Sequence, residues 1–136
     1  MLRCWKSLLI TASAVAASLA PVSAFAHHSY AAFDRSRRAQ ISGAVVSWEW
    51  TNPHSHLGVM APDDSGVMRT YDLELSSPNS LRASGWTRDA FAPGDKVKVE
   101  FYPRHDGGTG GNVIIVTKAD GRIYGHEPEI PTSERK

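Results

Sequence analysis

Four of the six histidines of this chain fall in two short segments, and their spacing suggests a metal site. His27 and His28 are adjacent and follow Ala24-Phe25-Ala26, whose small residues stand where signal peptidase prefers them. Cleavage after Ala26 would make His27 the new N-terminus. Its free α-amine and its imidazole would then form a chelate that copper(II) favours, and His28 would add another nitrogen.

The second segment runs from Asn52 to His56, at the start of an expected strand. Residues two apart on a strand face the same side, so His54 and His56 project together while Leu57 points into the core. Met60 shares the histidine face, but it lies about 13 Å from His56 at the usual rise of a strand. We therefore expect Met60 to be a packing residue and not a ligand of the same ion.

These histidines predict a mononuclear copper(II) site, formed by the amine and imidazole of His27 with His54 or His56, and with His28 as an alternative ligand. The arrangement at His27 resembles the N-terminal histidine of copper oxygenases and of periplasmic copper carriers, as a local motif and not as a fold. Two other interpretations stay open. His27 and His28 could be a polar tip that binds nothing in particular. His54 and His56 could instead shape the Asn-Pro turn.

A carboxylate is expected beside the second pair of histidines. Residues 55–61 and 68–75 have the composition of strands, and the turn-rich segment 62–66 joins them into a predicted hairpin. Matching their polar faces sets His56 opposite Glu74 and Gly58 opposite Asp72, at about 5 Å. Glu74 would then orient a ligating histidine through its far nitrogen, or form a surface pair of little energetic consequence.

Three tryptophans, Trp48, Trp50 and Trp86, form the other candidate site. On the face of a barrel they could stack a sugar or a base, whereas at its open end they would be core or a lid. Catalysis is less expected than binding. The spacing of the carboxylates does not by itself create an acid–base pair, and the chain lacks a nucleophile elbow, a phosphate-binding loop before a helix and a His-Glu-x-x-His motif.

The first 26 residues are expected to be a cleaved export signal. Arg3 and Lys6 give a positive start, and an apolar run extends from Leu8 to Ala20, short of the roughly 20 apolar residues of a membrane span. We expect the mature protein in the periplasm or secreted, without a membrane span. Cys4 would leave with the signal, so the mature chain would have no thiolate ligand, disulfide or cysteine nucleophile.

The charge balance argues against nucleic acid as a partner. The chain has 15 Lys and Arg residues and 14 Asp and Glu residues. Without Arg3 and Lys6 it keeps 13 basic residues, so the mature net charge is near −1. A nucleic-acid binder normally shows a clear basic excess. The expected partner is a small ligand or an unidentified component of the envelope, and nothing in the sequence indicates an oligomeric state.

The rest of the chain predicts an all-β fold with a small α content. Five segments alternate or are rich in β-branched and aromatic residues, and the first should be bent or bulged at Gly43. They are residues 39–50, 55–61, 68–75, 96–102 and 112–118. A short helix is expected at 76–85, with a serine N-cap, Pro78 near its first position and Gly85 at its end. Residues 122–125 would extend the sheet.

A helix between the third and fourth strands is the element order of a five-stranded oligonucleotide/oligosaccharide-binding (OB) barrel, whereas a β-sandwich would need about seven strands. The glycine-rich segment 107–111 is expected to be a flexible loop between the last two strands. The predicted organisation is a signal peptide at 1–26, an N-terminal arm at 27–38 with Tyr30 and Phe33 as anchors, an OB-like barrel at 39–125 and a disordered tail at 126–136.

Four sequence blocks, AHHSY, EWTNPH, SPNSLRASGW and PGD, support this picture. They resemble the signature blocks of DUF6152, an uncharacterised family of exported bacterial proteins described as a domain of unknown function. The resemblance runs in order from His27 to about Tyr124. It implies a small exported β-barrel-like domain and brings no established activity.

The sequence therefore predicts an exported small β-barrel that binds a transition metal, copper first, through its mature N-terminal histidine and a His-x-His strand. The first alternative is a non-catalytic binding module that uses barrel-face tryptophans for a saccharide, a peptide or an envelope partner. The second alternative is a copper-dependent oxidase, which needs the same histidines and an open coordination position.

Overall fold

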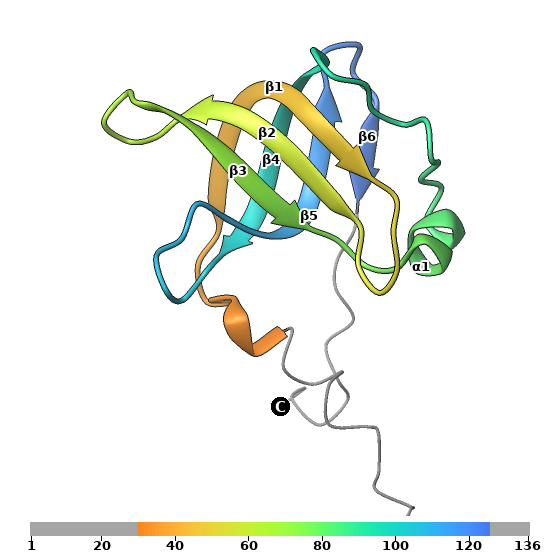
Figure 1. Ribbon diagram of the computed structural model, residues 1–136, viewed down its shortest axis with the longest axis horizontal. Helices are drawn as coiled ribbons and strands as arrows, with labels where there is room; N and C mark the ends of the chain where they lie inside the picture. The colour runs from red at the N-terminus through yellow and green to blue at the C-terminus, as the bar shows by residue number, and fades with distance from the viewer. Residues whose placement is uncertain (1–29, 126–136) are drawn as a thin grey trace, which may run out of the picture. The chain divides into compact units, whose positions relative to one another are not determined.

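A computed structural model describes residues 30–125, and Figure 1 shows their path. The expected export signal, His27, His28 and the expected tail lie outside the described residues. The chain separates into two units, residues 1–30 and 31–136, and the strands belong to the second. The described elements are η2 (Tyr30–Ala32), β1 (Ala39–Glu49), β2 (His56–Pro62), β3 (Met68–Glu74), α1 (Pro78–Ala83), β4 (Lys96–Pro103), β5 (Gly110–Lys118) and β6 (Ile123–Gly125).

The strands form one sheet that closes on itself. Its order is β3-β2-β1-β4-β5-β6, and a parallel pairing joins β3 to β5. The other neighbouring strands are antiparallel. This connectivity, with α1 between β3 and β4, is that of a five-stranded Greek-key barrel, so the predicted OB-like fold is confirmed. The short β6 extends the sheet at the segment predicted to do so.

Strand β1 is long because it serves two walls of the barrel. Its residues 39–44 pair with β4 and its residues 44–49 pair with β2, and Figure 1 shows the strand arching from one wall to the other. The sequence predicts a bend or a bulge at Gly43, and the register shift lies instead between Val45 and Ser47, so the bulge alternative is wrong in position. At Gly43 an added Cβ would overlap the carbonyl of Met60, so glycine permits the close approach of β1 to β2.

The short helix α1 begins and ends as the sequence predicts. Ser77 is the N-cap, and its side chain accepts a hydrogen bond from the backbone N of Ser80 at 3.4 Å. Pro78 stands at the first turn, and Gly85 follows the helix with a φ of 84°. Pro78 and Leu81 are buried, so the helix packs against the barrel.

The strands after the helix have the predicted burial, alternating in β4 and nearly continuous in β5, with one exception at the glycines. Val97, Val99 and Phe101 of β4 face inward and are 5%, 0% and 3% exposed. Strand β5 is buried along most of its length, because Val113 and Val116 lie in the main core while Ile114 packs in a second cluster with Phe33 and Tyr102. The predicted loop at 107–111 is only partly right, because Gly110 and Gly111 belong to β5.

The described part of the N-terminal arm docks on the end of β4. Phe33 is 4% exposed and packs with Tyr102 and Ile114, which confirms it as an anchor. The backbone N of His105 donates to the carbonyl of Ala32 at 2.9 Å, and the backbone N of Asp34 donates to that of Pro103 at 2.8 Å. The arm is therefore tied to the beginning of the loop between β4 and β5.

The main hydrophobic core fills the inside of the barrel. Leu57, Val59 and Leu73, which lie on the inward face of β2 and β3, are each 0% exposed. Aromatic residues close the end of the barrel near α1. Among residues 30–125 no helix has the length and apolar character needed to cross a membrane.

Candidate metal-binding site

His54 and His56 lie together on the outer face of the β2–β3 hairpin, as the alternation predicts. The side chains of both are 33% exposed, whereas Ser55 between them and Leu57 after them are 0% exposed. The β2–β3 register pairs His56 with Glu74 and Gly58 with Asp72, which confirms the predicted hairpin register. The outer face of this hairpin therefore carries two imidazoles beside two carboxylates.

Each histidine contacts a carboxylate along the same diagonal of the hairpin. His56 Nδ1 is 2.9 Å from Asp72 Oδ1, and His54 Nδ1 is 3.5 Å from Glu74 Oε1. Glu74 stands directly opposite His56 in the register but contacts His54 instead. The expected His56–Glu74 side-chain pair is therefore replaced by two diagonal pairs, which the right-handed twist of the strands brings together.

The geometry of these pairs fixes which nitrogen is left for a ligand. A carboxylate accepts hydrogen bonds, so the Nδ1 atom of His56 donates to Asp72. In a neutral imidazole the Nε2 atom then carries the lone pair that binds a metal. His54 Nδ1 lies at the longer distance of 3.5 Å from Glu74 Oε1, within ion-pair range. His56 therefore has the arrangement in which a carboxylate orients a ligating imidazole, and Glu74 gives His54 a longer contact of the same kind.

The described residues supply only part of a coordination sphere. Within residues 30–125 no group of three or more His, Cys, Asp or Glu side chains is placed to hold one ion. The two imidazoles would need further donors, and the predicted ones, His27 and His28, lie outside the described residues. Glu74 and Asp72 are turned toward the histidines, which suits an orienting role.

A cation from the loop between β4 and β5 borders these carboxylates. The guanidinium Nη2 of Arg104 is 3.0 Å from Asp106 Oδ2. The Asp106 hydrogen bond and charge, with smaller contributions from the charges of Asp72 and Glu74, raise the pKa of Arg104. In turn the Arg104 hydrogen bond lowers the pKa of Asp106 to about 2. Arg104 thus offsets part of the negative charge of the hairpin face, a neighbour that the sequence alone did not indicate.

The closure of the barrel explains why this loop lies beside β3. Parallel pairing sets Gly110 against Asp72, and the backbone N of Asp72 donates to the carbonyl of Thr109 at 3.3 Å. An added Cβ at Gly110, whose φ is 135°, would overlap the Asp72 carbonyl. Glycine is therefore needed at this contact, and the contact holds the backbone of Asp72 in position.

The tryptophans form part of an aromatic cluster at the end of the barrel. Trp86 is 0% and Trp50 is 8% exposed, and the rings of Trp48 and Trp86 are stacked with centroids 6.2 Å apart. Trp86 Nε1 donates to the carbonyl of Gly125 at 3.0 Å, and Trp48 Nε1 donates to that of Arg88 at 2.9 Å. This burial favours the core interpretation, and among the tryptophans of residues 30–125 only Trp48 keeps part of its surface for a ligand.

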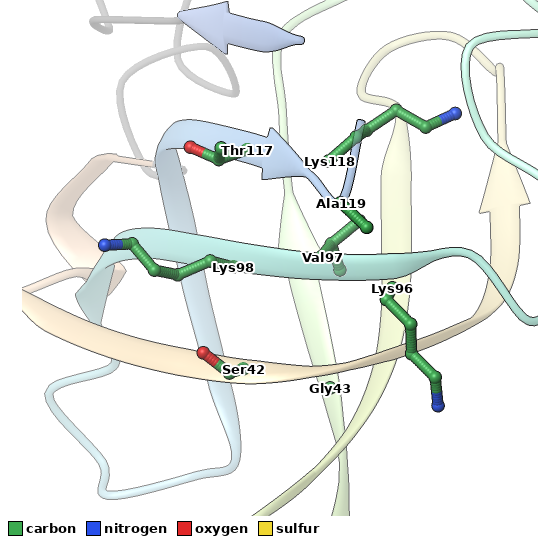
Figure 2. Close-up of a pocket in the computed structure, with 8 residues that line it drawn as sticks. All are labelled: Ser42, Gly43, Lys96, Val97, Lys98, Thr117, Lys118 and Ala119. Atoms are coloured by element: carbon green, nitrogen blue, oxygen red, sulfur yellow. The ribbon is translucent and has the colours of Figure 1, made fainter. Parts of the chain in front are cut away.

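A groove of about 440 Å³ lies on another wall, across β1, β4 and β5 (Figure 2). It is lined by Ser42, Gly43, Lys96, Val97, Lys98, Thr117, Lys118 and Ala119. Figure 2 shows Ser42, Lys98 and Thr117 pointing to the same side. Lys118 is held by Asp95 Oδ2 at 2.8 Å. The lining contains neither histidine nor carboxylate, so the groove does not extend the metal site.

These features define a small OB-type barrel with two carboxylate-oriented histidines on the outer face of one hairpin. The chain belongs to the Family of unknown function (DUF6152), whose model matches residues 14–113. The resemblance inferred from the sequence blocks is therefore confirmed. Comparison with curated proteins gives no significant match.

Among solved structures, the chain is similar to the mitochondrial single-stranded DNA binding protein Rim1 from S. cerevisiae. The TM-score is 0.44 and the sequence identity is 11%, over 63% of this chain and 97% of that chain. A likeness at this level carries no inference about function.

Proposed function

We propose that this protein binds a transition metal, copper(II) first, through the N-terminal histidine of its mature form together with His54 and His56. The observation that carries the proposal is the contact of each Nδ1 atom with a carboxylate, which leaves both Nε2 atoms for a metal. Imidazole suits copper, and copper(II) stands highest in the affinity order of the divalent first-row metals. The donor set therefore favours copper over the other divalent ions.

The docking of the arm supports a site completed by His27. Ala32 is hydrogen-bonded to His105, next to Arg104, whose pKa responds to the charges of Asp72 and Glu74. An extended chain spans at most about 3.6 Å per residue, so His27 stays within about 18 Å of Ala32.

Calorimetric titration with copper(II) tests the proposal on protein purified after export, with its N-terminus established by mass spectrometry. We expect one copper per chain, with a dissociation constant below about 1 μM. His27→Ala and a His54→Ala/His56→Ala double variant should each weaken binding at least about a hundredfold, because each removes nitrogen ligands.

His105→Ala is the matched control, because it also removes an imidazole but lies on the exposed loop after β4. It should bind copper as the unaltered protein does. Binding weaker than micromolar, or equal affinity in the His27→Ala variant, would contradict the proposal.

The orienting carboxylate gives a second prediction. Asp72→Asn should weaken copper(II) binding about tenfold, since it removes the charge that holds His56 Nδ1 as a donor. Asp64→Asn, an exposed residue of the β2–β3 turn, removes the same charge away from the histidines. Competition with a chelator of known affinity measures both variants. Equal affinities would mean that the charge of Asp72 does not act through His56.

A further inference from the structure

Two methionines are exposed on the hairpin face that carries the histidines. Met60 of β2 is 42% exposed and Met68 of β3 is 56% exposed. They are the methionines of the chain other than Met1. Both stand at the turn end of the hairpin. Met60 is four residues along β2 from His56, or about 13 Å. An ion bound by the methionines would therefore be separate from one bound by the histidines.

The hairpin register brings the two methionine side chains together. Met60 stands opposite Thr70, and Met68 stands opposite Pro62. Met68 is therefore two residues before the register partner of Met60, the same diagonal that joins His56 to Asp72 at 2.9 Å. Diagonal Cβ atoms on one face are about 7–8 Å apart, within reach of two long side chains. From the twist that makes the histidine contacts we therefore expect Met60 to lean toward Met68.

Both methionines are exposed, and the residues beside them in the hairpin register do not repel a cation. Thr70 and Pro62, their register partners, carry no charge. Arg69 alternates onto the other face, where its Nε atom is 3.1 Å from Asp63 Oδ2. No cation among these neighbours therefore opposes a bound metal ion. A thioether is a soft, uncharged donor that selects soft ions such as copper(I).

We propose that Met60 and Met68 form a two-thioether site for a soft monovalent cation of the copper(I) and silver(I) class. The site uses none of the ligands of the histidine site, so it stands or falls independently of copper(II) binding. Water would complete the coordination.

Titration with silver(I) in chloride-free buffer, followed through ¹³C-labelled methionine methyl groups, tests this proposal on the exported protein. We expect the Met60 and Met68 resonances to shift together and to saturate at one silver ion per chain. Met60→Leu and Met68→Leu should each lower the affinity at least about tenfold, and in each the remaining methyl should lose its response at low silver. Leucine has a similar volume, so the fold is retained.

A His54→Ala/His56→Ala double variant is the control, because imidazoles also bind soft ions. It should keep the coupled methionine shifts, even if copper(II) no longer binds. A response of one methyl alone, separate saturation of the two methyls, or unchanged affinity in the leucine variants would overturn the proposal.

Discussion

Replacing Gly110 with alanine is expected to destabilise the barrel by about 3 kcal/mol or more. The φ of Gly110 is 135°, a conformation that side chains disfavour, and an added Cβ would overlap the carbonyl of Asp72. The parallel β3–β5 pairing would have to open to relieve that overlap. Chemical denaturation followed by tryptophan fluorescence measures the loss. The loss should be a large fraction of the free energy of unfolding that is usual for a small domain.

Two other glycines separate the causes of this loss. Gly121 has a φ of 87° and open space around its Cβ position, so Gly121→Ala should cost about 1 kcal/mol from backbone conformation alone. Gly125 has neither constraint, so Gly125→Ala should change the stability by less than about 0.5 kcal/mol. A Gly110→Ala protein no less stable than Gly121→Ala would mean that the strands separate at this contact without appreciable cost.

The role of Gly110 is not contained in the sequence pattern around it. Glycine-rich composition between two strands predicts a loop, and the sequence carries no sign that the last glycines pair with β3. That pairing joins residues about forty positions apart, and it needs glycine because two backbones meet there. A local pattern contains no information about such a distant contact. The position predicted for the bulge in β1 is wrong for a related reason. The bulge depends on where β1 changes from pairing with β4 to pairing with β2.

On the outer face of the β2–β3 hairpin, the backbone arrangement could be predicted from the sequence, but the side-chain contacts of the histidines could not. Alternation placed His54 and His56 on one side, and the short turn fixed the register that sets His56 opposite Glu74. Period-two patterns and loop length determine both features. The side-chain contacts instead follow the diagonal, because the sheet is twisted, so Asp72 is the hydrogen-bond partner of His56. When the partners of a side chain are predicted from a hairpin sequence, diagonal neighbours should therefore be considered as well as the residue directly opposite.

The sequence left two roles open for the tryptophans, a stacking surface or part of the core. Their burial in the folded protein decides between the two. Trp86→Ala is expected to cost about 3–5 kcal/mol, because the ring is 0% exposed and its removal leaves a large cavity. The ring packs within 5.1 Å of that of Tyr124 and within 5.9 Å of that of Phe91, measured between centroids. Thermal and chemical denaturation followed by far-ultraviolet circular dichroism would measure the loss.

Trp86→Phe separates packing from hydrogen bonding at this position. It keeps most of the ring volume but removes the Nε1 donor to the carbonyl of Gly125, so we expect a smaller loss of about 1–3 kcal/mol. If Trp86→Ala leaves the stability unchanged, the ring is not core, and a stacking site for a saccharide or peptide becomes the better account of the cluster. If the loss is as expected, Trp86 is a core residue that holds the end of the barrel together, as its burial indicates.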